Sequence, residues 1–238
     1  MITLRFSPTW FYGVDILFEI LVVIVTILIG VYAYRLYKFS DNYRYKYLAL
    51  SFWALTVSFM SKVAANYVIY FHRAVKESLG TAVEQYQLTN YSNIAFQIGY
   101  DIHRFLLFMG LLGIYWLVSK SKNHEHVWFM TFFLFIITLF SFQAYFVFHL
   151  VAAVMLFVIA KHYHKLCFTK GKKKASKHSH FNFMAFVLLF ISQIVFTFTY
   201  MNRTMYVIAE IIQFMGFATF LINHVALVLK YGKKKNKD

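Results

Sequence analysis

The sequence has almost none of the residues that cross-link or break a fold. Of its 238 residues only one is a cysteine, Cys167, and only one is a proline, Pro8. A single cysteine excludes an intramolecular disulfide and a cysteine-based metal cluster. Because the one proline precedes all the apolar segments, no predicted membrane segment is broken by proline, which weakens the case for a transporter built on discontinuous helices.

Charge is also scarce, at 14% of residues, whereas 61% are hydrophobic and 21% aromatic. The mean hydropathy is +0.59. Soluble domains are about 45–50% apolar, so this composition is typical of a membrane protein. In such a chain the net charge of +15 indicates topology rather than affinity for nucleic acid, and we expect no nucleic-acid partner.

The apolar segments predict an all-α, polytopic protein of the cell membrane, with residues 1–238 forming one domain of seven transmembrane helices. The expected helices are residues 14–35, 47–70, 94–118, 125–141, 144–161, 181–200 and 204–229. The run 127–160 is too long for one crossing, so we divide it near Ser141–Gln143. Residues 71–93 are expected to form the longest outer loop, with a short helix on the membrane surface.

Basic residues predict the orientation. With the N-terminus outside and the C-terminus inside, most of the 24 Lys and Arg residues lie on the cytoplasmic side, as the positive-inside rule requires. The loop Lys161–His180 and the tail Lys230–Asp238 are polybasic. We expect both to attract anionic lipid headgroups of the bilayer. The alternative is a docking surface for a cytoplasmic signalling partner.

Three ionisable residues, Asp101, His103 and Arg104, lie within an apolar segment long enough to span the bilayer. A charge at the bilayer centre costs about 2.5–3.5 kcal/mol on insertion scales. Gln97, Asp101 and Arg104 are spaced to share one face of a helix. That face is therefore expected to point into the protein interior or a wet cavity.

Other segments carry polar residues at a similar depth in the outer half of the membrane. The predicted ligand-binding residues are Asp101, Arg104, Glu210, Lys62, Glu19, Gln213, His103 and His149. We expect them to form a pocket that opens outward and binds a small polar or charged ligand, or a proton. The alternatives are a structural ion-pair network and, for His149, a satisfied interior imidazole.

Signals for cofactor or enzyme chemistry are weak. His149 and His162 have a spacing used by haem ligands in membrane cytochromes, which leaves a haem protein as a remote alternative. The histidines of the predicted inner face have no cysteine partners that would make a zinc site. The chain has no HExxH motif and no glycine-rich phosphate loop. We expect no cofactor, no metal and no enzymatic activity.

The chain contains a possible internal repeat of three helices, one linker helix and three helices. Asp101–Phe105 is similar to Glu210–Phe214, and Phe52–Ser58 is similar to Phe186–Ser192. The arrangement resembles the seven-helix architecture of rhodopsin-like and other heptahelical sensor proteins. It also resembles the sugar-transporter family built from two three-helix repeats and a linker helix.

Both resemblances are architectural only. The retinal-binding families need a lysine midway along the last helix, and here the segment 204–229 has none. The Pro-Gln pair of the transporter family is also absent. We therefore expect a receptor- or sensor-like membrane protein, and a small-solute or ion transporter or channel that uses the same pocket is the alternative.

Overall fold

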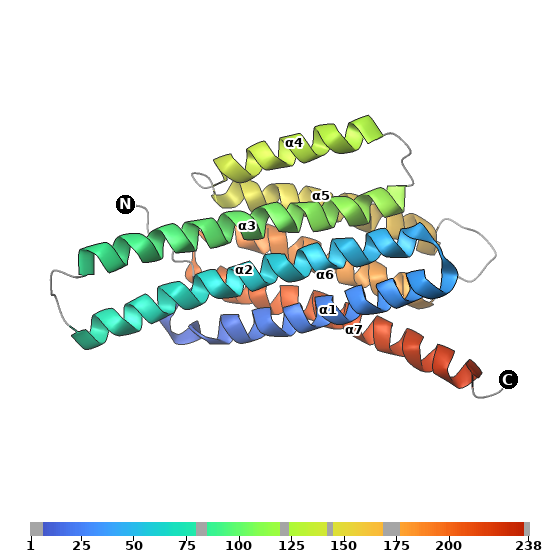
Figure 1. The fold of residues 1–238 in the computed structure, drawn as a ribbon, viewed down its shortest axis with the longest axis horizontal. Coiled ribbons are helices and arrows are strands. Elements are labelled where there is room, and N and C mark those ends of the chain that lie inside the picture. Colours follow the sequence, from blue (N-terminus) through green and yellow to red (C-terminus); the bar gives the residue numbers. More distant parts are fainter. Residues whose placement is uncertain (1–6, 80–84, 120–123, 142–144, 169–176, 236–238) are drawn as a thin grey trace.

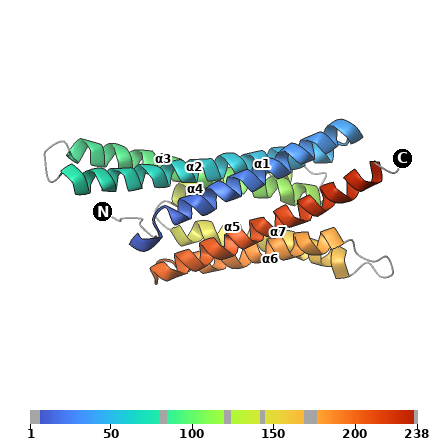
Figure 2. The ribbon, with the colours of Figure 1, turned by 90° about the horizontal axis from the view of Figure 1, so that it is seen from below.

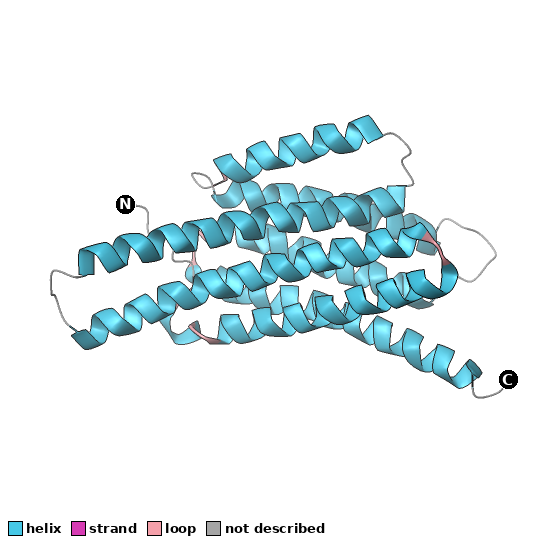
Figure 3. Ribbon diagram, in the orientation of Figure 1, coloured by secondary structure: helices cyan, strands magenta, loops and turns pink. Residues whose placement is uncertain are grey.

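The computed structural model describes residues 7–79, 85–119, 124–141, 145–168 and 177–235. Regular structure in these residues is helical throughout, which confirms the predicted fold class (Figure 3). A short 3-10 helix, Thr9–Phe11, comes first. The helices that follow are α1 (Val14–Ser40), α2 (Tyr43–Leu79), α3 (Gln85–Ser119), α4 (His124–Phe140), α5 (Tyr145–Phe168), α6 (Lys177–Thr197) and α7 (Arg203–Lys235).

Among the described residues, six helices are long and apolar enough to span a membrane, namely α1, α2, α3, α5, α6 and α7. Helix α4 has 17 residues, and its apolar part is Trp128–Phe140. At 1.5 Å per residue α4 is about 25 Å long, which is less than the hydrocarbon thickness of about 30 Å. The chain is thus a multi-pass helical membrane protein, and the seventh crossing and the orientation stay predictions.

The helices form two groups of three. Helices α1, α2 and α3 pack in sequence as an N-terminal group, and α5, α6 and α7 pack in sequence as a C-terminal group. The two groups lie as separate layers in Figure 2. They meet where α1 packs against α7 and α3 packs against α5, while α4 lies on the outside against α3 (Figure 1). A three-plus-one-plus-three repeat would pack in this way, although the repeat itself stays a prediction.

Several helices are longer than the apolar segments that predicted them. Helix α2 continues to Leu79 and α3 begins at Gln85, so the long outer loop with a surface helix is wrong. The basic loop Lys161–His180 is likewise partly helical, because α5 runs to Phe168 and α6 begins at Lys177. Charged residues such as Lys76 and Glu77 form helix as readily as apolar ones, so hydropathy marks where the membrane ends and not where the helix ends.

The division of the long apolar run is confirmed. Helix α4 ends at Phe140 and α5 begins at Tyr145, on either side of the predicted break. The turn residue Ser141 is fully buried, and its hydroxyl donates to the carbonyl of Thr138 at 2.7 Å. Side-chain hydrogen bonds of this kind satisfy carbonyl groups where a helix stops.

Glycine allows α3 to lie close to α2. A Cβ atom added at Gly110 would be 2.7 Å from the Leu55 side chain, and one added at Gly99 would be 2.9 Å from Ala65 Cβ. Small residues at such crossings are how membrane helices gain close packing without a hydrophobic driving force. The apolar core, which includes Phe108 and Leu156, fills the end of the bundle that we predict to be cytoplasmic. The buried ionisable residues gather towards the other end.

Candidate functional site

Twelve buried or half-buried polar residues of the cluster come from six helices by one simple rule. Each helix presents two polar side chains four residues apart, which places both on one face. The pairs are Asp15 and Glu19 on α1, Lys62 and Asn66 on α2, Tyr100 and Arg104 on α3, Tyr145 and His149 on α5, Gln193 and Thr197 on α6, and Tyr206 and Glu210 on α7. These faces meet where the two groups of helices come together.

Lys62 lies at the centre of the first half of the cluster. Its Nζ is 2.9 Å from Glu19 Oε1 and 2.6 Å from Glu210 Oε1, and all three residues are buried. Asn66 Nδ2 donates to both carboxylate oxygens of Glu19, at 3.0 and 3.2 Å. The Tyr100 hydroxyl in turn donates to Asn66 Oδ1 at 3.0 Å. Because Glu210 comes from α7, the lysine ties the N-terminal group to the C-terminal group.

Arg104 organises the second half and is only 2% exposed. Its Nη1 is 3.3 Å from Asp101 Oδ1 and donates to Ser141 Oγ at 3.2 Å. The guanidinium also lies 5.7 Å from the centre of the Tyr145 ring and 5.8 Å from that of Phe148, within cation–π range. Its Nε has no hydrogen-bond partner. Hydrogen bonds therefore hold Nη1 of this guanidinium but not Nε.

His149 is also held on one side only. Its Nδ1 is 2.7 Å from Gln193 Oε1, and Gln193 Nε2 donates to Gln213 Oε1 at 3.3 Å. The imidazole stacks on Phe196, with ring centres 4.8 Å apart. The second ring nitrogen, Nε2, is buried without a hydrogen-bond partner. A chain of two amides therefore fixes the ring and leaves one nitrogen available.

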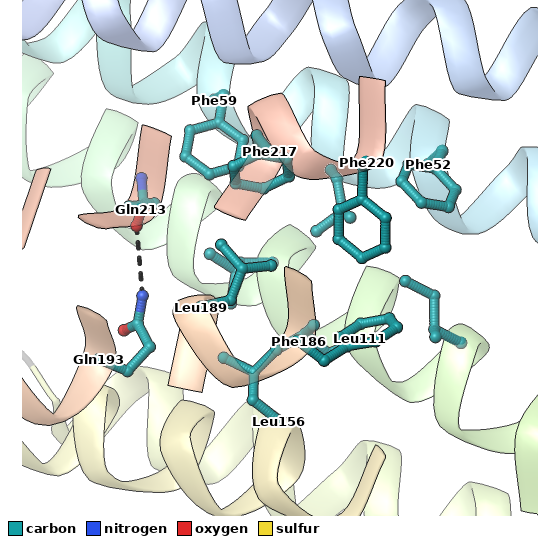
Figure 4. A pocket seen from close by; sticks show the side chains of 13 residues that line it. Phe52, Phe59, Leu111, Leu156, Phe186, Leu189, Gln193, Gln213, Phe217 and Phe220 are labelled. Atoms are coloured by element: carbon teal, nitrogen blue, oxygen red, sulfur yellow. Dashed lines mark hydrogen bonds between the residues drawn. The ribbon is translucent and has the colours of Figure 1, made fainter. Parts of the chain in front are cut away.

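A small cavity of about 10 Å³ lies among these groups, lined by Lys62, Arg104 and His149 together with aromatic and amide side chains. That is about the space needed for one water molecule. Gln193 and Gln213 line this cavity and also a second one of about 30 Å³. Figure 4 shows their hydrogen bond at one edge of the second cavity, beside phenylalanine and leucine side chains. The amide pair separates a polar space from an apolar one.

The structure brings most of the predicted site residues together, in pairs that the sequence did not specify. Lys62 contacts Glu19 and Glu210, whereas Arg104 contacts Asp101. His149 and Gln213 are joined through Gln193. His103 borders the same cavity, but its Nδ1 is 2.8 Å from Ser58 Oγ on α2. Asp101 lies at the edge, since its side chain is 31% exposed.

Sequence reasoning missed several partners. Tyr100 and Tyr145 line the cavity, Ser58 holds His103, and Ser141 accepts from Arg104. The Tyr70 hydroxyl also donates to the Asp15 carboxylate at the outer edge. Spacing could have found most of them. Ser58 precedes Lys62 by four residues, as Tyr100 does Arg104 and Tyr145 does His149.

A second polar contact lies at the predicted cytoplasmic end, between α6 and α7. Asn223 Nδ2 donates to Asn182 Oδ1 at 2.7 Å, and Asn223 Oδ1 is 2.8 Å from His178 Nδ1. Within the described residues, no group of three His, Cys, Asp or Glu side chains is placed to hold a metal ion. This contact joins two helices of one group, whereas the Lys62 cluster joins the two groups.

The chain matches no family model, and no curated protein or solved structure is similar to it. The class of protein therefore follows from the structure alone. The six apolar helices define an integral, multi-pass membrane protein, and its buried polar cluster is the candidate site.

Proposed function

We propose that the protein is a receptor- or sensor-like, non-enzymatic membrane protein whose buried cluster binds a small charged ligand, and that this ligand is a proton. The observation that carries the proposal is that two buried carboxylates, Glu19 and Glu210, share the single ammonium group of Lys62. These three groups carry a net charge of −1 when all are ionised. An uncompensated charge is costly in a dry interior, and one bound proton would remove it.

The position of the proton determines how the two groups of helices are joined. Glu19 and Lys62 both belong to the N-terminal group, whereas Glu210 belongs to the C-terminal group. A proton on Glu210 would leave the Lys62–Glu19 ion pair intact and reduce the contact between the groups from an ion pair to a hydrogen bond between the ammonium and an uncharged carboxyl. Binding therefore favours one relative position of the groups, which is the differential interaction that a two-state sensor requires.

The remainder of the bundle suits a sensor. The cavity within the cluster has room for about one water molecule, and the second cavity beside the Gln193–Gln213 pair is lined mainly by apolar side chains (Figure 4). In the predicted orientation a change in the groups would reach the basic cytoplasmic segments, where anionic lipid headgroups or a cytoplasmic partner would respond.

The test measures the distance between the two groups. Spin labels at Phe39→Cys in α1 and Phe168→Cys in α5, both exposed, report on the predicted cytoplasmic ends when Cys167 is replaced by serine. We expect the distance distribution of the reconstituted protein to differ between pH 5 and pH 8. Glu210→Gln, which imitates a protonated carboxyl, should give the pH 5 distribution at both values, and the exposed Asp41→Asn should behave like the parent. One distribution shared by all samples would refute the sensor.

A transporter is the second candidate, and the location of the cavity supports it. The cavity lies between the two groups of helices, and transporters with parallel repeats hold their substrates at the corresponding interface. Proteoliposomes containing a pH-sensitive dye would decide the matter. Proton flux down an imposed gradient in the wild type, lost in Glu210→Gln, would favour transport over sensing.

A further inference from the structure

The cavity beside Lys62 has the lining of an anion site. It is bordered by two cationic side chains, Lys62 and Arg104, by two imidazoles and by phenol and amide groups. No carboxylate is among the residues that line it. Glu19 and Glu210 contact Lys62 but do not border the cavity, and Asp101 contacts Arg104 without bordering it either. The positive charges border the cavity, and the negative charges lie behind them.

Two of the residues that line this cavity each carry an unpartnered polar atom. Arg104 Nε and His149 Nε2 are the described buried side-chain nitrogen or oxygen atoms without a hydrogen-bond partner. Their residues are 2% and 4% exposed, so bulk water does not satisfy them. A buried unsatisfied group typically costs about 1–3 kcal/mol, and more when it is charged. Two such atoms at one small cavity indicate a bound group that hydrogen-bonds to both.

From this geometry we infer that the cavity binds one small monovalent anion of halide size, such as chloride, between Arg104 Nε and His149 Nε2. The cavity of about 10 Å³ has room for about one water-sized group, and a monatomic halide is closer to that size than a carboxylate or a phosphate is. The inference goes beyond the proposed proton sensor and does not rest on it, since it concerns Arg104 and His149 and not the two glutamates.

The amide chain decides whether His149 can donate to such an anion. As arranged, Gln193 Oε1 faces His149 Nδ1, so Nδ1 carries the ring proton. In a neutral ring Nε2 then has no proton and would accept a hydrogen bond from water. If Gln193 and Gln213 both turn their amides over, Gln193 Nε2 donates to Nδ1 and the ring proton moves to Nε2. His149 Nε2–H and Arg104 Nε–H then both donate to the anion.

Equilibrium binding of radioactive chloride to the purified protein, with gluconate holding the ionic strength constant, tests the inference. We expect saturable binding of about one chloride per chain and a rise in melting temperature that gluconate does not produce. Arg104→Lys keeps the charge but lacks Nε–H, and His149→Phe keeps a ring but lacks Nε2. Each should bind chloride about tenfold more weakly, the loss typical of a hydrogen bond to a charged group.

The control is Arg203→Gln, which removes an exposed positive charge at the start of α7 and should bind like the wild type.

If a cavity variant does not fold, bromide soaked into crystals of the wild type locates the anion by its anomalous scattering. A bromide peak between Arg104 and His149 supports the inference. No saturable chloride binding to the wild type, a peak elsewhere, or unchanged binding in both folded variants would overturn it and mean that the cavity holds water. The distance measurement on Glu210→Gln would still stand, so failure here is distinct from failure of the sensor.

Discussion

The two groups of helices meet along two sides, and the chemistry of those sides is opposite. Where α1 packs against α7, the acids Glu19 and Glu210 share Lys62. Where α3 packs against α5, the basic residues Arg104 and His149 each leave a nitrogen unpartnered. On the first side one lysine contacts two acids, and on the second side two basic residues each keep a nitrogen without a hydrogen-bond partner.

The packing of two glycines indicates which residues of α3 and α7 occupy equivalent positions in the two groups of helices. Gly110 of α3 lies against Leu55 of α2, and Gly216 of α7 lies against Leu189 of α6. Leu55 and Leu189 also correspond in the predicted repeat of Phe52–Ser58 with Phe186–Ser192. Aligning Gly110 with Gly216 aligns Arg104 with Glu210 in the sequence. This alignment differs by three residues from the predicted one, which aligns Asp101 with Glu210. Aligning Arg35–Leu36 with Lys165–Leu166 also aligns Glu19 with His149, so bases on one side take the places of acids on the other.

The difference between the sides shows that buried charged residues can either join helices through ion pairs or leave hydrogen-bonding capacity for a bound group. On the α1–α7 side every ionised group has a close partner, so this side fastens the two groups together. On the α3–α5 side the binding capacity is incomplete, and incomplete satisfaction of buried polar groups is the mark of a site that holds something further. Lys62 thus lies between the carboxylates proposed to bind a proton and the cavity proposed to bind an anion.

The largest effect is expected from Lys62→Met. This change leaves two buried carboxylates without their cation, and breaking a buried ion pair typically costs about 3–5 kcal/mol. Equilibrium unfolding of the detergent-solubilised protein measures the loss. Adding Glu19→Gln and Glu210→Gln to Lys62→Met should recover much of it, since no charge is then stranded. The exposed Lys38→Met serves as the control, and a loss no larger than that of the control would show that Lys62 does not fasten the groups.

The membrane architecture could be predicted from sequence because hydrophobicity is a local property. The apolar segments located the six spanning helices, and the polar residues Ser141 and Gln143 located the break between α4 and α5. The ends of the helices could not be predicted in the same way. Helix α2 runs on to Leu79 because polar residues outside the membrane also favour helix, and nothing in their hydropathy marks a stop.

The members of the candidate site could also be predicted, because a charge within an apolar segment is costly unless it faces the interior. Their pairing could not. Lys62, Asp101 and Glu210 lie at similar depth, and only the lateral order of the helices decides that Lys62 contacts Glu210 and not Asp101. The position of Ser141 next to Arg104 likewise depends on how α4 lies against α3.

A smaller effect is expected on the α3–α5 side, from Arg104→Gln. The change strands Asp101, but the side chain of Asp101 is 31% exposed, so water can compensate its charge. We expect a loss of about 1.5–3 kcal/mol, the usual range for hydrogen bonds to charged groups. The double variant Asp101→Asn with Arg104→Gln should lose less than the sum of the single changes, since the two residues interact directly. Additive losses in a double-mutant cycle would show that the pair is not coupled.

The smallest effect is expected from the glycines, which test whether the two groups are packed alike. A Cβ at Gly110 would lie 2.7 Å from the Leu55 side chain and 3.0 Å from the Ser51 carbonyl oxygen. At Gly216 it would lie 2.8 Å from Leu189 and 3.3 Å from the Ala185 carbonyl oxygen. The leucine can shift in both cases, but the backbone oxygen cannot. Gly110→Ala should therefore destabilise the protein slightly more than Gly216→Ala.

The size of that effect follows from two opposing contributions. Overpacking typically destabilises a protein by about 1–3 kcal/mol, whereas replacing glycine by alanine within a helix stabilises it by about 0.5–1 kcal/mol. We expect net losses of roughly 1–2 kcal/mol for Gly110→Ala and a little less for Gly216→Ala. Pairing each with a smaller neighbour, Leu55→Ala or Leu189→Ala, should remove the part of the loss that comes from the leucine and leave the part that comes from the backbone oxygen, which is closer at Gly110. If only one glycine behaves in this way, the two groups differ in their packing as well as in their charges, and the pairing of Arg104 with Glu210 loses its support.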